Sequence, residues 1–162
     1  MYNFLGEFEC KLDDRNRLIV PAALLKQIPG VEDDGLVVNR GFEKHLVLYT
    51  KKQWDKITEE MSALNPYEEK VRMFRRYFSR GATPLKVDKS FRILLPQTLM
   101  EYAGIPNSSE VVISCVMDTI EVWAKSAYDE QLGIEPVEFS KLAQEVMGNK
   151  AKKDDGARRG DD

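Results

Sequence analysis

Two short segments of the chain carry the same charged pair at the same spacing. Residues 13–17 read DDRNR and residues 88–92 read DKSFR, so an aspartate stands four residues before an arginine in both. The fork of an arginine can grip phosphate oxygens or the edge of a guanine base. An aspartate at this spacing can also tie its own turn together by a charge-assisted hydrogen bond. The two roles are compatible, because each aspartate can orient the arginine that reaches outward.

The two motifs are candidates for contact with a nucleic acid. The expected DNA contacts are Arg15, Arg17, Lys89 and Arg92. The residues expected to orient the loops are Asp13, Asn16 and Asp88. Asparagine and aspartate suit turns because they hydrogen-bond nearby backbone and tolerate left-handed backbone angles. The acidic residues offset much of the local positive charge, so one motif alone would bind a polyanion weakly.

The motifs lie inside a longer internal repeat. With an offset of 75, residues 18–21 align with 93–96 and residues 36–38 with 111–113, after which a one-residue deletion changes the offset. Each copy predicts a strand, the motif turn, a short apolar strand, a brief helix and two more strands. A proline opens each helix at its first position, and the helices are expected to end near Gly30 and Gly104.

A unit this small cannot bury a core alone, so the copies are expected to pair into one pseudo-symmetric barrel. The fold class is therefore α+β and mainly β, built from tandem β-β-α-β-β repeats with flanking helices. The expected segments are repeat 1 (7–54), a helical connector (55–82), repeat 2 (83–126), a C-terminal helical extension (127–147) and a disordered charged tail (148–162). Trp54 and Tyr128 align between the copies and are expected to be core residues.

The connector should contain two helices. Thr50 and Gln53 form the pattern of a capping box, and Asn65-Pro66 gives a second helix start. A basic cluster follows, in which we expect a salt-bridged helix surface or an interface between subunits. Its members are Arg72, Arg75, Arg76 and Arg80. Arg40, at a strand end, is expected to cap a turn.

Composition points to an intracellular protein without a cofactor. The formal net charge is −3, so any anion-binding surface must be local. His45 is the single histidine and has no ligands at metal spacing, while Cys10 and Cys115 suit reduced thiols. The N-terminus carries Glu7 and Glu9 and does not resemble a signal peptide, and no apolar run reaches membrane-spanning length. We therefore expect a cytoplasmic protein with no membrane partner, metal or small-molecule substrate.

Three longer segments resemble the MraZ family, a tandem-repeat branch of the AbrB-like (SpoVT-AbrB) superfamily. They are FLGEFECKLDDRNRLIVPAAL, FRRYFSRGA and KVDKSFRILLPQTLMEYAGI, and the resemblance covers roughly residues 1–130. It implies a swapped-hairpin barrel, a ring-shaped homo-oligomer, and binding to short direct repeats in a promoter. It also implies a nucleoid-associated repressor of the division and cell-wall gene cluster, with the two Asp-x-x-x-Arg motifs contacting DNA.

The chain departs from the family pattern just before each arginine, where the family usually has glycine. Asn16 can take a positive φ angle, whereas Phe91 would be strained if the second turn needs one. The C-terminal segment has no counterpart in this resemblance.

Two other functions fit parts of the sequence. An antitoxin-like or ring protein of the same superfamily could act through a protein partner bound at the C-terminal tail. An aspartic-protease-like enzyme could use Asp13 and Asp88, one from each half. The enzyme is disfavoured, because each aspartate has an arginine four residues on that would hold it ionised, and neither motif reads Asp-Thr-Gly or Asp-Ser-Gly.

Overall fold

The computed structural model describes residues 2–158, with side chains described for residues 2–148. It divides into one unit spanning Met1–Tyr128 and another spanning Asp129–Asp162. The strands are β1 (Glu7–Lys11), β2 (Arg17–Ile19), β3 (Leu36–Arg40), β4 (Leu46–Thr50), β5 (Thr83–Leu85), β6 (Arg92–Leu94), β7 (Glu110–Val116) and β8 (Thr119–Ala124). The helices are α1 (Ala22–Leu25), α2 (Val31–Asp34), α3 (Lys51–Ser62), α4 (Glu69–Ser79), α5 (Gln97–Ala103), α6 (Lys125–Leu132) and α7 (Pro136–Arg158). The predicted mix of helices with mainly antiparallel strands is confirmed.

The two copies exchange strands within the first unit. A six-stranded sheet has the order β1-β7-β8-β4-β3-β5, and a separate two-stranded ribbon pairs β2 with β6, all antiparallel. Strand β1 of copy one therefore pairs with β7 of copy two, and β5 of copy two pairs with β3 of copy one. Neither copy completes its own sheet, because its first strand lies on the other copy.

The strand registers show that the copies are related by a pseudo-two-fold axis. Phe8 pairs with Ile113, and the equivalent Thr83 pairs with Val38. In the ribbon, Leu18 pairs with its own repeat equivalent Ile93, so the axis passes through this pair. The repeat alignment read from the sequence therefore holds in three dimensions.

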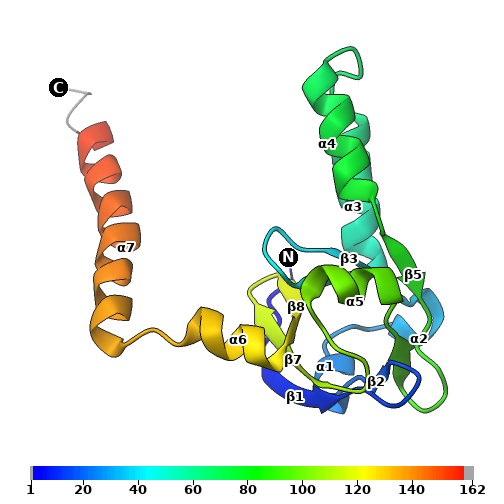
Figure 1. Ribbon diagram of the computed structural model, residues 1–162. Coiled ribbons are helices and arrows are strands. Elements are labelled where there is room, and N and C mark those ends of the chain that lie inside the picture. The colour runs from blue at the N-terminus through cyan, green and yellow to red at the C-terminus, as the bar shows by residue number, and fades with distance from the viewer. Residues whose placement is uncertain (1, 159–162) are drawn as a thin grey trace. The chain divides into compact units, whose positions relative to one another are not determined.

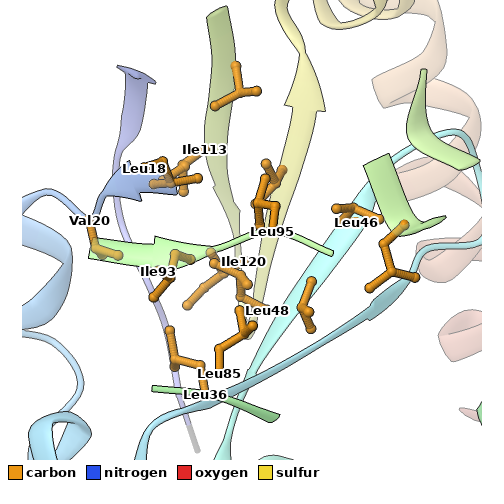
Figure 2. Packing of buried hydrophobic residues seen from close by; sticks show 14 of the residues in the cluster. Leu18, Val20, Leu36, Leu46, Leu48, Leu85, Ile93, Leu95, Ile113 and Ile120 are labelled. Atoms are coloured by element: carbon orange, nitrogen blue, oxygen red, sulfur yellow. The ribbon is translucent and has the colours of Figure 1, made fainter. Parts of the chain in front are cut away.

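The core lies between the sheet and the ribbon. Figure 2 shows Leu18 and Ile93 from the ribbon beside Ile113, Ile120 and Leu48 from the sheet. All five side chains are almost completely buried. The ribbon is thus anchored by its inner residues, and alternation along a strand turns its outer residues to the opposite face.

Both sheet edges carry residues that discourage further pairing. Strand β1 has exposed Glu7, Glu9 and Lys11 between half-buried Phe8 and Cys10, as its alternating pattern predicts. Strand β5 contains Pro84, which cannot donate to a neighbouring strand. The half-buried Cys10 and Cys115 are free thiols, and burial raises the pKa of both.

The helix starts differ in part from expectation. Pro21 and Pro96 are N-caps of α1 and α5, one position earlier than predicted. Helix α5 ends at Gly104 in the left-handed conformation as expected. In copy one α1 ends at Leu25 rather than near Gly30, hydrogen-bonded turns continue to Ile28, and a second short helix, α2, starts at Val31 after Pro29-Gly30.

Helices α3 and α4 form a hairpin that projects from the sheet (Figure 1). The capping box of Thr50 and Gln53 is confirmed at the start of α3. Helix α4 begins only at Glu69, so the predicted start at Asn65-Pro66 is wrong. The Asn65 side chain instead accepts a hydrogen bond from the Tyr67 backbone in the intervening turn.

Trp54 and Tyr128 are half-buried, so the expectation that they are core residues is wrong. Trp54 stacks on Phe78 of α4 with ring centroids 5.7 Å apart, which holds the base of the helical hairpin. Tyr128 packs edge-on against Trp123. The alignment of the two copies predicted that Trp54 and Tyr128 occupy equivalent positions. It could not predict how much of each side chain its neighbours cover.

The second unit is helical. Helix α7 continues to Arg158 and so runs through much of the segment predicted as a disordered tail from residue 148. Residues 159–162 of that prediction lie outside the described residues. Within the described part of the chain, the helices are too short or too polar to cross a lipid bilayer.

Candidate nucleic-acid interface

The aspartate of the first motif holds its loop by three hydrogen bonds. Asp13 Oδ1 accepts from the backbone N–H groups of Arg15 and Arg17, both at 2.9 Å. Its other oxygen, Oδ2, accepts from Arg17 Nε at 3.0 Å. The backbone closes the turn, since Asp13 N–H donates to the Arg17 carbonyl. The aspartate thus serves the structural role and fixes the arginine at the same time.

The second motif repeats this geometry atom for atom. Asp88 Oδ1 accepts from the backbone of Ser90 at 2.8 Å and of Arg92 at 2.9 Å. Asp88 Oδ2 accepts from Arg92 Nε at 2.9 Å. Within the described residues, the terminal nitrogens of Arg17 and Arg92 have no protein partner. Each arginine is therefore oriented through Nε and leaves its outer fork available.

Each loop turns at a residue with a positive φ angle and is bonded to the other copy there. Asn16 has φ 59° and Phe91 has φ 62°. The Asn16 carbonyl accepts from the Leu95 backbone at 3.1 Å, and the Phe91 carbonyl accepts from the Val20 backbone at 2.8 Å. The residue with positive φ in each loop is thus held by the residue just after the strand that follows the other loop.

The Asn16 side chain has further partners that the sequence did not reveal. Its amide nitrogen donates to Asn107 Oδ1 at 3.1 Å and Gln97 Oε1 at 3.3 Å, and its oxygen accepts from the Ser108 backbone at 3.3 Å. Ser108 also donates from its hydroxyl to the Asp13 carbonyl. In the sequence, the turn-forming residues Pro106, Asn107 and Ser108 indicate a loop with polar side chains, but not that this loop contacts Asn16. The Phe91 side chain has no polar atoms and cannot make equivalent bonds.

Glycine at position 91 should stabilise the protein. A phenylalanine at positive φ costs about 1–2 kcal/mol, whereas glycine adopts that conformation freely at a smaller cost in chain entropy. We expect Phe91→Gly to raise the free energy of unfolding by about 1 kcal/mol, measured by urea denaturation. Asn16→Gly is the matched control and should give no gain, because it removes the bonds to Asn107 and Ser108. A loss of stability in Phe91→Gly would instead show that the exposed ring contributes through packing.

Hydrogen bonds within the loops lower the pKa values of both motif aspartates. The Arg17 backbone N–H, followed by that of Arg15 and the Arg17 guanidinium, holds the pKa of Asp13 below its ordinary value of 3.8. The Arg92 backbone N–H, with the Arg92 side chain and the Ser90 N–H, lowers the pKa of Asp88 in the same way. Each carboxylate therefore binds protons less readily in the folded than in the unfolded chain.

This linkage predicts a pH-dependent contribution to stability. A group whose pKa is lower in the folded than in the unfolded chain stabilises the fold. This stabilisation is complete at a pH above the pKa of the unfolded chain, and it is lost as the pH falls through the pKa of the folded chain. We expect the Asp13→Asn, Asp88→Asn double variant to be less stable than wild type at neutral pH. The difference should shrink in acid below the ordinary aspartate pKa of 3.8. Urea unfolding across this range measures it, and an unchanged difference in strong acid would contradict the assignment.

The ribbon carries one loop at each end, because Arg17 opens β2 and Arg92 opens the antiparallel β6. Arg15 and Lys89 are exposed within the loops, and Arg17 and Arg92 are partly exposed. The structure thus joins all four predicted DNA contacts to a single small element. The two aspartates do not share a site of the protease kind, since each is bound inside its own loop.

Three other arginines donate to backbone carbonyls within the fold. Arg40 donates from Nη2 to the Tyr77 carbonyl in the last turn of α4, and its guanidinium lies 5.2 Å from the centre of the Tyr102 ring. Arg75 donates to the carbonyls of Met61 and Leu64, joining α4 to the end of α3. Arg72 donates to the Pro66 carbonyl. In the predicted basic cluster, Arg72 and Arg75 therefore bind backbone oxygens rather than carboxylates.

His45 is buried between acidic and aromatic neighbours. Its Nε2 lies 3.2 Å from Glu121 Oε2, and its ring stacks on Trp123 with centroids 4.5 Å apart. Hydrogen bonding from His45 lowers the pKa of Glu121. Among the described residues, no three or more His, Cys, Asp or Glu side chains gather in a way that suits a metal ion.

Comparison with known proteins agrees with the tandem architecture. Residues 3–77 and residues 78–155 each match the family described as "MraZ protein, putative antitoxin-like". A protein of Christiangramia forsetii named transcriptional regulator MraZ is 38% identical over 150 residues, spanning 92% of this chain and 96% of that protein. Proteins of the same name from Flavobacterium psychrophilum and Cytophaga hutchinsonii are 33% and 31% identical, spanning 92% and 89% of this chain and 94% of each relative.

The names of these relatives describe a regulatory role rather than catalysis. The two matched segments together span most of the sequence, and each contains one Asp-x-x-x-Arg motif. The second match extends to residue 155, so the expectation that the C-terminal segment has no counterpart in the family is wrong. The chain therefore belongs to the MraZ family.

Proposed function

We propose that this chain is a sequence-specific DNA-binding transcriptional regulator, and that it represses the division and cell-wall gene cluster of its own cell. The observation that carries the proposal is the pair of matched loops, in which an aspartate fixes an arginine through Nε and leaves the outer fork free. Transcriptional regulation is also the role named for the relatives. The protein would then work in the cytoplasm on the nucleoid.

The electrostatics of the loops suit this role. Asp13 and Asp88 are ionised at neutral pH, which lies far above the ordinary aspartate pKa of 3.8, and hydrogen bonds within the loops lower their pKa values further. Each carboxylate holds its arginine in place, so less side-chain entropy is lost when the guanidinium meets a phosphate or a guanine edge. Arg15 and Lys89, both exposed, add contacts with the phosphate backbone.

A single chain offers only four basic contacts, so affinity would come from repetition. We propose that the exchanged strands close into a swapped-hairpin barrel and that several chains form a ring facing short direct repeats in the promoter. A second loop tethered by the ring acts at millimolar effective concentration, which raises overall affinity by roughly 10² to 10⁴. Occupied repeats would block polymerase and repress transcription.

A gel-shift titration with DNA from upstream of the protein's own gene tests the proposal. We expect binding that requires more than one repeat and weakens with salt, with a slope of log K against log salt of about −0.9 per phosphate neutralised. A shuffled sequence of the same composition is the control. Equal binding to both sequences would remove sequence specificity, and no binding to either would favour the antitoxin-like alternative, in which a protein partner is the target.

A further inference from the structure

The outer face of the β2–β6 ribbon carries two aliphatic side chains that the core does not use. Ile19 is 61% exposed and Leu94 is 55% exposed, although both stand in strands. Their neighbours Leu18 and Ile93 are essentially fully buried on the inner face. Packing therefore explains the inner residues and leaves the outer pair without a structural role.

The register places this pair among the motif arginines. Arg17 lies opposite Leu94, and Ile19 lies opposite Arg92. Residues two apart on a strand share a face, so Arg17 and Ile19 stand together on β2, as Arg92 and Leu94 do on β6. The outer face is thus a two-by-two pattern with the arginines on one diagonal and the aliphatic residues on the other.

We propose that this face enters the major groove of DNA and that Ile19 and Leu94 contact thymine methyl groups. The inference rests on the proposed function and adds the residues that would read A·T pairs. The major groove admits a two-stranded ribbon, and the thymine methyl is the one apolar group that a base pair displays there. Arg17 and Arg92, which Asp13 and Asp88 hold in place, would bind guanine edges or phosphates next to the contacted thymine.

The composition of the face favours DNA over a protein partner. A protein-binding surface of this kind would be a larger apolar patch, whereas here each aliphatic residue stands opposite an arginine in the strand register. The two-fold relation of Ile19 and Leu94 also predicts that they contact symmetry-related positions of one binding site. Such contacts supply base discrimination that phosphate-binding arginines lack.

Replacing thymine by uracil tests the proposal, because it removes only the methyl group. Each thymine of one bound repeat is changed in turn, and affinity is measured for wild type and for Ile19→Ala and Leu94→Ala. We expect uracil at one or two positions to weaken wild-type binding about fourfold, as for one buried methyl group. Each variant should bind unmodified DNA about fourfold more weakly than wild type does. It should also no longer respond to uracil at the thymine that the replaced side chain contacts.

Val116→Ala is the matched control, since Val116 is an exposed aliphatic residue at the end of another strand. It should bind like wild type and keep the uracil response. Uracil effects of equal size in wild type and in both ribbon variants would overturn the methyl contacts while leaving the DNA-binding function intact. Absence of any sequence-specific binding by wild type would overturn the proposed function together with this inference.

Discussion

The Arg17→Ala, Arg92→Ala double variant is expected to lose promoter binding while remaining folded. A hydrogen bond to a charged group contributes about 1.5–3 kcal/mol, so removing one from each loop should weaken binding by roughly 10² to 10⁴. The fold should survive, because Asp13 and Asp88 keep their bonds to backbone N–H groups. Gel-shift titration measures the affinity, and thermal unfolding reports the fold.

A charge-matched control separates specific contacts from general attraction. Lys52 and Lys56 lie exposed on α3, away from the loops, and their double alanine variant removes the same formal charge. Its affinity should change far less than that of the loop variant. If the loop variant bound DNA normally, the arginines would be structural alone. If it failed to fold, the hydrogen bonds of the Asp-x-x-x-Arg motifs would be needed for the stability of the ribbon, and a role in orienting the arginines for DNA would not be supported.

The largest loss of stability is expected from truncating the pair on the pseudo-two-fold axis. Leu18 is 0% exposed and Ile93 is 1% exposed, and both belong to the buried hydrophobic cluster. Replacing either by alanine leaves a cavity and should lower the free energy of unfolding by about 2–5 kcal/mol. For a chain of this length, such a loss lowers the melting temperature by roughly 10 °C.

The adjacent outer residues provide the comparison for this experiment. Ile19→Ala and Leu94→Ala remove similar side chains from exposed positions and should shift the melting temperature by only a degree or two. Calorimetry of the four single variants gives the contrast directly. Similar losses for inner and outer variants would mean that the outer face is covered by another part of an assembly.

Repetition in the sequence predicted most of the first unit. Because the copies align residue by residue, the order of strands in one copy predicted that of the other, and the buried positions followed from alternation. The two Asp-x-x-x-Arg loops and the strain at Phe91 also followed from local residue types. These features depend on short-range chemistry, which a single sequence records directly.

Features that depend on distant partners could not be predicted. Arg40 looked like a turn residue, because nothing in its surroundings along the chain indicates Tyr77 or Tyr102 as partners. Trp54 and Tyr128 looked like core residues, because a large aromatic residue does not reveal how much of it a neighbour covers. The exposed Ile19 and Leu94 resembled any other strand residues until the register set them beside the arginines.

The exchange of strands between copies also constrains how the protein is made. Strand β1 emerges from the ribosome first, yet its partner β7 lies about a hundred residues later. At synthesis rates of about 5–20 residues per second, β1 remains without its partner for roughly 5–20 s. Charged side chains disfavour edge-to-edge pairing, so we expect Glu7, Glu9 and Lys11 to keep the unpaired β1 from pairing with other nascent chains. The same charges that protect the sheet edge in the folded protein would thus also protect the unpaired strand during synthesis, before β7 has been made.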